Sequence, residues 1–100
     1  MVVDHLMTDT PEVRRNDDAG RYEILADGQV AGYTEFRADG DVLTFPHTVV
    51  ESAFEGRGLA GTLVAEALDD VRRRGQKIVP TCAYVRHFVE KHPEYADLVA

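Results

Sequence analysis

The stretch Phe54-Glu55-Gly56-Arg57-Gly58-Leu59-Ala60-Gly61-Thr62 opens the longest amphipathic helix that this sequence predicts. Three glycines and an alanine stand at that start, so no bulky side chain covers the first backbone N–H groups of the helix. Such N–H groups are unpaired and carry partial positive charge, which favours a phosphate group. The spacing matches neither a Walker loop nor Gly-x-Gly-x-x-Gly. The stretch therefore predicts either a phosphate site or a flexible turn that only allows close packing.

The sequence after this stretch predicts a helix, a strand and a second helix. Apolar residues recur four apart from Leu59 to Val71, three arginines follow, and Gly75 supplies a stop. We predict a helix over 58–74, a short strand over 76–81, a helix over 84–91 that His92-Pro93 ends, and a last turn over 95–99.

The sequence before this stretch alternates apolar and polar residues. Asp27-Gly28 and Asp39-Gly40 interrupt the alternation, and this dipeptide is typical of two-residue hairpin turns in which both positions take positive φ. We predict strands over 12–15, 21–26, 30–37 and 41–50. The alternation places Tyr22, Ile24 and Ala26 on one face of their strand, and Val30, Gly32, Thr34 and Phe36 on one face of the next.

This order predicts an α+β fold in which an antiparallel meander is followed by a βαβ unit. The strands 41–50 and 76–81 are therefore expected to be parallel. Pro46 lacks an N–H, which predicts a bulge or a break in pairing inside the strand 41–50. We expect a single domain over 12–100 and a loosely ordered segment over 1–11.

Composition argues against several classes of protein. Eleven basic residues against eighteen acidic ones give a net charge of −7, which argues against a nucleic-acid partner. No apolar run approaches the length of a membrane span, residues 1–7 do not resemble a signal peptide, and the single Cys82 rules out an internal disulfide. We expect a cytoplasmic protein without a membrane partner, of open oligomeric state. His87 and His92 have no third ligand nearby, so no metal site is expected.

Four segments together resemble a known superfamily. They are Pro46-His47-Thr48-Val49-Val50, the glycine stretch, Val79-Pro80-Thr81-Cys82 and His92-Pro93-Glu94-Tyr95. Gly58-x-Ala60, with Glu55 in the slot for Gln or Arg, resembles the acetyl-CoA pyrophosphate loop of GNAT-type N-acetyltransferases. The whole set, over residues 12–99, is similar to the small stand-alone, acetyltransferase-like branch of that superfamily.

The resemblance implies a GNAT-like splayed mixed sheet with two helices and a binding site for acetyl-CoA (coenzyme A). It assigns Gly56, Arg57, Gly58, Leu59, Ala60, Gly61 and Thr62 to the pyrophosphate, mainly through backbone N–H groups. It assigns Thr48, Val49 and Val50 to the pantetheine arm, which would lie like an extra strand beside them. The basic residues Arg86, His87, Lys91 and His92 would meet the 3′-phosphate, or they form a solvated helix face.

The sequence departs from the family pattern at three points. Glu55 replaces the usual Gln or Arg and puts a carboxylate on the phosphate side. Val49 stands where relatives often have an acid after His-Thr, so a proton acceptor of that kind is missing. The helical pair that most members insert after the first strand is absent, so we expect an open acceptor pocket.

Acetyl transfer to an amine requires that the amine lose a proton, and the departing thiolate benefits from gaining one. His47 is a candidate base beside the expected pantetheine strand, or a histidine hydrogen-bonded within the sheet. Cys82, at a helix start, is a candidate nucleophile or proton donor, or a small buried filler. Tyr84 is a further candidate proton donor, or a packing residue.

These observations predict an N-acetyltransferase that moves an acetyl group from acetyl-CoA to an amine acceptor by direct attack. Residues 1–50 hold ten acidic and four basic residues, which favours a cationic acceptor. Three alternatives stay open: a relay through Cys82, a non-catalytic module that binds CoA or acyl-CoA, and an interaction domain whose glycine turn binds nothing.

Overall fold

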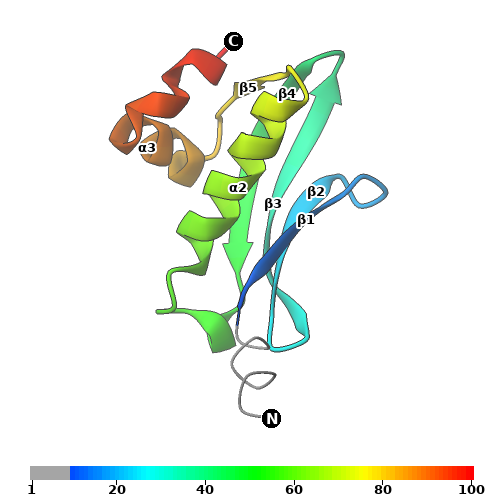
Figure 1. Cartoon of the computed structure of the whole chain (residues 1–100), viewed down its shortest axis with the longest axis vertical. Coiled ribbons are helices and arrows are strands. Elements are labelled where there is room, and N and C mark those ends of the chain that lie inside the picture. The colour runs from blue at the N-terminus through cyan, green and yellow to red at the C-terminus, as the bar shows by residue number, and fades with distance from the viewer. Residues whose placement is uncertain (1–9) are drawn as a thin grey trace.

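The structure is a computed structural model that describes residues 10–100 of the chain (Figure 1). The segment 1–11, expected to be loosely ordered, lies almost entirely outside the described residues. The elements in chain order are β1 (Glu12–Asn16), β2 (Arg21–Ala26), β3 (Gln29–Asp39), β4 (Val42–Val50), η1 (Ser52–Phe54), α2 (Leu59–Arg73), β5 (Lys77–Val79), α3 (Ala83–Lys91) and η2 (Pro93–Leu98).

One five-stranded sheet, in the order β1-β2-β3-β4-β5, organises the molecule. β1 to β4 pair antiparallel with their neighbours in the chain, and β5 pairs parallel with β4. The predicted meander and βαβ unit are confirmed. The predicted elements agree with the observed ones to within two residues at each end, whereas the sequence does not predict η1.

Both two-residue turns form, but only one has the predicted geometry. Asp27 and Gly28 take φ values of 53° and 79°, as the Asp-Gly pattern predicts. In the next turn β3 runs through Asp39, so the loop residues are Gly40, with a φ of 61°, and Asp41. The prediction of positive φ at both Asp39 and Gly40 is therefore wrong. Gly40 occupies the first loop position, and a turn with glycine at that position does not require positive φ at the second loop residue.

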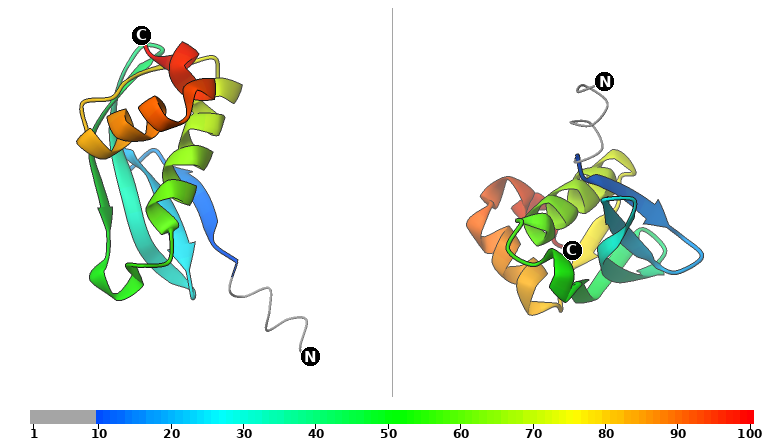
Figure 2. Two further views of the ribbon diagram at one scale, coloured as in Figure 1. Left: turned by 90° about the vertical axis from the view of Figure 1, so that its left-hand side faces the viewer. Right: turned by 90° about the horizontal axis from the view of Figure 1, so that it is seen from below.

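α2 packs in the concave face of the curled sheet, and α3 lies beside α2 along β4 (Figure 2). Leu63 and Leu68 of α2 are fully buried, and so are Tyr22 and Ile24 of β2, which confirms that these two residues share a face of that strand. Burying each large apolar side chain contributes about 1.5–3 kcal/mol relative to exposure. Within residues 10–100 no helix covers the convex face of the sheet.

A bulge in β3 changes which of its residues face the core. The β2–β3 register shifts between Ile24 and Leu25, so β3 carries one extra residue there. Ala31 is fully buried, whereas Val30 is only partly buried. The prediction that Val30 shares a face with Gly32 is therefore wrong, because the extra residue reverses the alternation.

Tyr22 links β2 to α2. Its hydroxyl donates a hydrogen bond to Asp70 Oδ2 at 2.7 Å and accepts one from Arg15 Nη1 at 3.1 Å. Burial and the hydrogen bond to Asp70 raise the pKa of Tyr22 to about 12. This bond fixes how the C-terminal half of α2 lies on the sheet.

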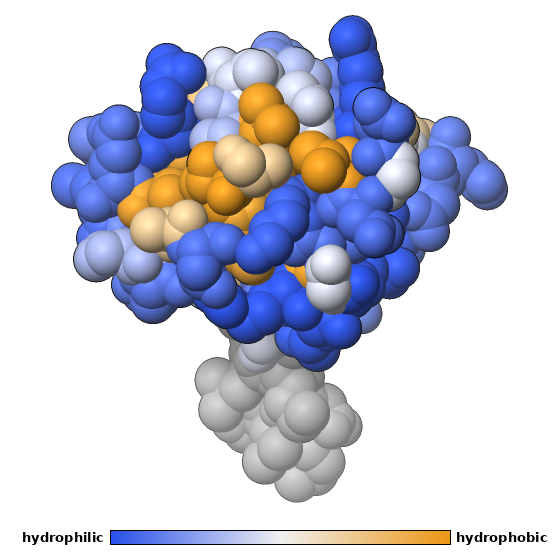
Figure 3. All heavy atoms as spheres, turned by 90° about the horizontal axis from the view of Figure 1, so that it is seen from above, coloured by the Kyte–Doolittle hydropathy of each residue, from blue (hydrophilic) through white to orange (hydrophobic). Residues whose placement is uncertain are grey.

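The C-terminal segment ties η2 to α2 and β5. Arg72 Nη1 donates to Asp97 Oδ2 at 2.8 Å, and Val99 forms a parallel bridge with Ile78 of β5. Figure 3 shows apolar surface at this end of the molecule within a hydrophilic surround. The contacts position α3, because α3 leads directly into η2.

Glu23 is a buried carboxylate on the convex face of the sheet. Its side chain is 2% exposed and accepts hydrogen bonds from Arg14 Nε at 3.0 Å, Arg21 Nε at 2.8 Å and Asn16 Nδ2 at 3.2 Å. Burial raises the pKa of Glu23, but the hydrogen bonds from Arg21, Arg14 and Asn16 outweigh burial and lower the pKa below its usual value. The cluster stabilises the pairing of β1 with β2.

Replacement of Glu23 by Gln should lower the free energy of unfolding at pH 7 by about 1–3 kcal/mol, because it removes charged hydrogen bonds from a buried group. A carboxyl with a lowered folded-state pKa contributes stability above its unfolded pKa of about 4.3, and this is lost as pH falls through the folded pKa. Urea titrations from pH 7 to pH 3 should show a steeper acid loss for the wild type than for Glu23→Gln. The exposed Glu12→Gln control should keep the wild-type slope, and equal acid losses in Glu23→Gln and the wild type would contradict the assignment.

Candidate functional site

β4 and β5 separate after a short stretch of pairing. Their parallel register joins only Val42–Thr44 to Lys77–Val79. The β3–β4 register shifts opposite Phe45-Pro46, which confirms the irregularity predicted from Pro46. The Phe45 carbonyl accepts the last bonds between the two segments, from the Cys82 N–H at 2.7 Å and the Thr81 hydroxyl at 3.2 Å. Beyond Phe45 the strands diverge, and one edge of β4 is left open.

The open edge presents the backbone of Thr48 and Val50. The Glu51 N–H donates to the Ala31 carbonyl at 2.8 Å, which indicates that the backbone of Val49 also faces β3. Alternate residues of a strand point their backbone N–H and C=O groups to opposite sides. Thr48 and Val50 therefore direct theirs away from β3, where an extended ligand can pair with them.

The glycine stretch forms an exposed turn between η1 and α2. Phe54, which is 7% exposed, anchors the turn in the core. Gly56 and Gly58 take φ values of 83° and 72°, a left-handed conformation that other residues adopt only with strain. No atom lies within 4 Å of the position of a Cβ on either residue, so backbone conformation rather than crowding requires these glycines.

The first turn of α2 offers backbone N–H groups that no side chain caps. Gly58 is the N-cap, and no acidic residue lies in the first turn. The Thr62 hydroxyl donates back to the Gly58 carbonyl at 3.4 Å rather than pointing out of the helix start. The N–H groups of Leu59, Ala60 and Gly61 thus retain the partial positive charge of a helix N-terminus.

Two cavities meet beside this helix start. The first, called here the glycine cavity, has a volume of about 270 Å³ and is lined by residues of the glycine stretch together with Val50 and Tyr84. The second, the α3 cavity, has a volume of about 310 Å³ and is lined by Gly61, Tyr84, His87, Phe88, Lys91 and His92. Gly61 and Tyr84 line both, and a Cβ on Gly61 would lie 3.7 Å from the Tyr84 hydroxyl. A ligand at the open β4 edge can therefore extend past the helix start to α3.

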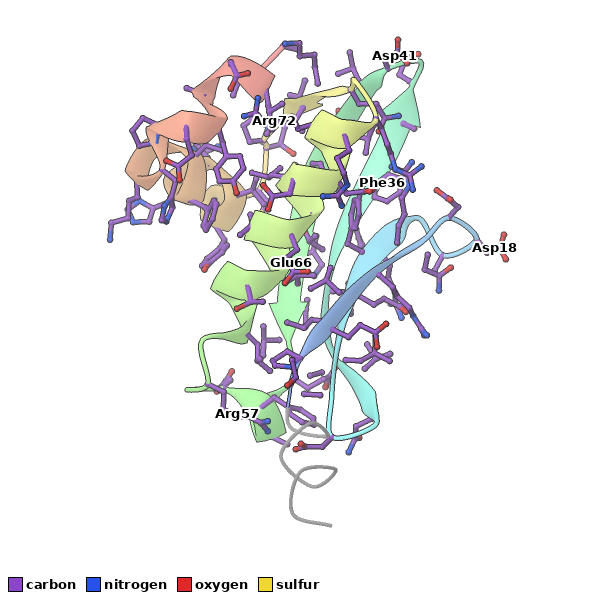
Figure 4. The ribbon with its side chains drawn as sticks, in the orientation of Figure 1. Asp18, Phe36, Asp41, Arg57, Glu66 and Arg72 are labelled. Carbon is purple, nitrogen blue, oxygen red and sulfur yellow. The ribbon has the colours of Figure 1, made fainter. Side chains whose placement is uncertain are left out.

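Arg57 points its side chain away from the glycine cavity. Its guanidinium pairs with Asp27 Oδ2 at 3.0 Å and lies 5.3 Å from the ring centroid of Phe54 (Figure 4). Gly56 and Gly58 line the cavity, but the Arg57 between them does not. The charge of Arg57 therefore faces the β2–β3 turn rather than the glycine cavity. Sequence reasoning missed Asp27 because the two residues are 30 positions apart.

Cys82 and Thr48 meet where β4 and β5 diverge. The Cys82 thiol donates to Thr48 Oγ1 at 3.4 Å, and Thr48 Oγ1 lies 2.8 Å from Thr34 Oγ1. Thr34 is fully buried and Cys82 is 9% exposed. Cys82 is also the N-cap of α3, although its side chain makes no capping bond. The structure thus places the thiol against the open edge of β4, with a hydroxyl partner.

His47 lies on the convex face of the sheet, away from the helices. Its side chain is exposed, its ring centroid lies 6.4 Å from that of Tyr33, and its partner in the β3 register is Glu35. The buried thiol of Cys82 lies on the helix side, so the sheet separates these two candidates. Tyr84 is 41% exposed and stands in the wall between the cavities.

The basic residues of α3 border the α3 cavity. His87 is 65% exposed, with Nδ1 4.0 Å from the Glu90 carboxylate. The His92 ring centroid lies 4.2 Å from that of Phe88, so this aromatic pair lines the cavity together with His87 and Lys91. Arg86 does not line this cavity.

Two further features bear on chemistry and location. Across residues 10–100, no cluster of three His, Cys, Asp or Glu side chains has the arrangement of a metal site. None of the helices in that range combines the length and apolar character needed to cross a membrane.

Comparison with known proteins gives a consistent result. The family model described as GCN5-related N-acetyl-transferase matches residues 21–98. A GCN5-like putative N-acetyltransferase from Staphylococcus aureus superposes with a TM-score of 0.68 at 22% identity, over 89% of this chain and 87% of that chain. The ribosomal-protein-S18-alanine N-acetyltransferase from Escherichia coli superposes with a TM-score of 0.61 at 14% identity, over 91% of this chain and 58% of that chain.

Curated relatives match a smaller part of the chain. Protein NATD1 from Bos taurus and Protein NATD1 from Homo sapiens are each 36% identical over 52 residues, which is 52% of this chain and 46% of theirs. The chain thus spans about half the length of the curated relatives that it matches.

Proposed function

Because the chain belongs to the GCN5-related N-acetyltransferase family, we propose that it transfers an acetyl group from acetyl-CoA to an amine acceptor. The observation that carries this proposal is the uncapped start of α2, which opens into the glycine cavity beside the free edge of β4. That combination offers backbone donors for a diphosphate and a strand edge for an extended chain. A diphosphate and an extended chain are parts of acetyl-CoA rather than of the amine acceptor.

In this proposal each part of the groove holds one part of acetyl-CoA. The N–H groups of the first turn of α2 hold the pyrophosphate, since unpaired N–H groups and the helix dipole both favour an anion. The backbone of Thr48 and Val50 pairs with the pantetheine amides. His87 and Lys91, which line the α3 cavity, meet the 3′-phosphate.

The diverging strands then separate the two proton transfers. Attack by the amine nitrogen on the thioester carbonyl forms the amide bond and breaks the carbon–sulfur bond. In this proposal His47, on the convex face, accepts the proton that the amine loses. Cys82 and Tyr84, on the helix side, are the candidates to give a proton to the departing thiolate. We retain direct attack, because Cys82 is 9% exposed and its thiol already donates a hydrogen bond to Thr48.

A second candidate is a module that binds CoA without transferring its acetyl group. Glu55 lines the glycine cavity, so a carboxylate lies on the phosphate side, where it weakens anion binding. Val49 stands at the position after His47-Thr48 where relatives often have an acid. Binding without turnover would therefore support this second candidate.

Gly61 variants test where CoA binds. Gly61→Ala should raise the free energy of unfolding by up to about 1 kcal/mol, because alanine favours a helix over glycine. The same substitution should weaken CoA binding several-fold, and Gly61→Leu should weaken it more than tenfold, since the added side chain projects between the two cavities. Titration calorimetry with CoA measures the affinity, and urea unfolding measures the stability.

The matched control is Glu66→Leu, which adds the same side chain to an exposed position of α2 outside both cavities. It should bind CoA like the wild type. Unchanged CoA affinity in a folded Gly61→Leu variant would remove the glycine cavity from the proposal. Absence of any CoA binding by the wild type at millimolar concentration would favour an interaction domain instead.

Variants of the candidate catalytic residues separate direct attack from a relay. His47→Gln should lower kcat by about 100-fold, the usual contribution of a general base, and should leave the Kd for CoA unchanged. Cys82→Ala should lower kcat less than tenfold, and mass spectrometry of wild type mixed with acetyl-CoA should show no acetyl group on Cys82. Loss of all transfer in Cys82→Ala, together with acetylated Cys82 in the wild type, would replace direct attack by the relay.

A further inference from the structure

The convex face of the sheet gives access to the diverging strands from the side opposite the helices. No helix within residues 10–100 covers this face, and His47 of β4 is exposed on it. Val49 lies two residues from His47 along β4, and Tyr33, which pairs with Val49, lies two residues from Glu35 along β3. Residues two apart in a strand share a face, so Tyr33 and Val49 lie on the same face as His47. An acceptor that approaches from here reaches the free edge of β4 without displacing α2 or α3.

Glu35 supplies an unpaired carboxylate beside His47. The register places Glu35 opposite His47 on β4 and opposite Arg21 on β2, and Cα atoms of such hydrogen-bonded partners are about 5.5 Å apart. Arg21 is otherwise engaged, since its Nε donates to Glu23 at 2.8 Å and its guanidinium lies 4.3 Å from the Tyr33 ring centroid. Among the described residues, no side chain forms a hydrogen bond or ion pair with the Glu35 carboxylate.

Three other carboxylates around the site are engaged or face the co-substrate. Glu23 is enclosed by its arginines, Asp27 pairs with Arg57, and Glu55 lines the glycine cavity on the phosphate side. Glu51, which follows β4, is also exposed, but it lies four positions beyond His47 in the chain. Glu35 is the carboxylate that the register sets directly opposite His47. Its partial burial strengthens such a contact relative to one at a fully exposed position.

We propose that Glu35 binds the ammonium group of the acceptor and so favours acceptors that are cationic at neutral pH over uncharged amines. This inference rests on the proposed acetyl transfer. An amine of the lysine type has a pKa of about 10.4 and arrives as the ammonium ion. Held by Glu35, it lies beside His47, which takes one N–H proton and leaves the nitrogen lone pair free to attack the thioester. Glu35 of β3 then selects the charged acceptor, and His47, its neighbour on β4, accepts the proton.

Glu35→Gln tests this inference because it keeps the size of the side chain and removes its charge. With Nα-acetyl-lysine amide as acceptor, the variant should show a KM at least about tenfold higher, the effect expected for losing a charged hydrogen bond. Its KM for acetyl-CoA should be unchanged. With p-anisidine, an aromatic amine that is neutral at pH 7.5, the KM should be the same in variant and wild type. Glu66→Gln, on α2, is the matched control and should behave like the wild type with both amines.

A binding measurement separates this inference from the proposed function. Titration of Nα-acetyl-lysine amide into ¹⁵N-labelled protein with CoA present should shift the backbone amide signals of Glu35 and His47, and Glu35→Gln should abolish those shifts. Binding at Glu35 without any acetyl transfer would uphold the ammonium site and overturn the enzymatic proposal. Acetyl transfer with an unchanged KM for the lysine amide in Glu35→Gln would uphold the enzyme and overturn the role of Glu35.

Discussion

The divergence of β4 from β5 is the constraint on which the rest of this structure depends. Pro46 has no N–H, and the Phe45-Pro46 bulge interrupts the β3 register at the level where β4 loses β5. The Phe45 carbonyl is still satisfied, by the Cys82 N–H and the Thr81 hydroxyl. The divergence therefore leaves no buried acceptor unpaired, which would be costly. Beyond that point two residues of β4 keep backbone groups free for a ligand.

The second requirement is that the start of α2 lie beside that free edge. The buried leucines of α2 and the bond from Tyr22 to Asp70 hold the helix along the concave face. Phe54 anchors the turn that leads into it. The glycine stretch is therefore fixed at its first residue, Phe54, and continues as an exposed turn in which Gly56 and Gly58 take positive φ values. The N–H groups at the start of α2 can stay exposed to a ligand because the buried residues of the helix hold it in place.

Local patterns in the sequence predict most of the fold. Period-two alternation, the Asp27-Gly28 turn and the four-residue spacing in α2 each describe neighbours along the chain, and all three are confirmed. The misassigned face of Val30 and the second turn both depend on a one-residue shift, which alternation alone cannot locate. Pro46 is the exception, because its missing N–H marks an irregularity without any knowledge of the partner strand.

The site is less accessible to such reasoning. The glycine stretch and Thr48 to Val50 can be singled out from a local motif and a family resemblance, and their roles stay predictions. The pairing of Arg57 with Asp27, the contact of Cys82 with Thr48 and the juxtaposition of Glu35 with His47 join residues that are distant in sequence. Only the three-dimensional register brings them together.

The single helical layer also bears on how long the folded chain survives. A domain of this size buries a limited part of its apolar surface, and within residues 10–100 no helix covers the convex face of the sheet. Domains typically have a margin against unfolding of about 5–15 kcal/mol, and a ligand present at about 100 times its Kd would add about 2.7 kcal/mol to it. Resistance to proteases would consequently rise and fall with ligand supply, and the amount of protein present would report on that supply.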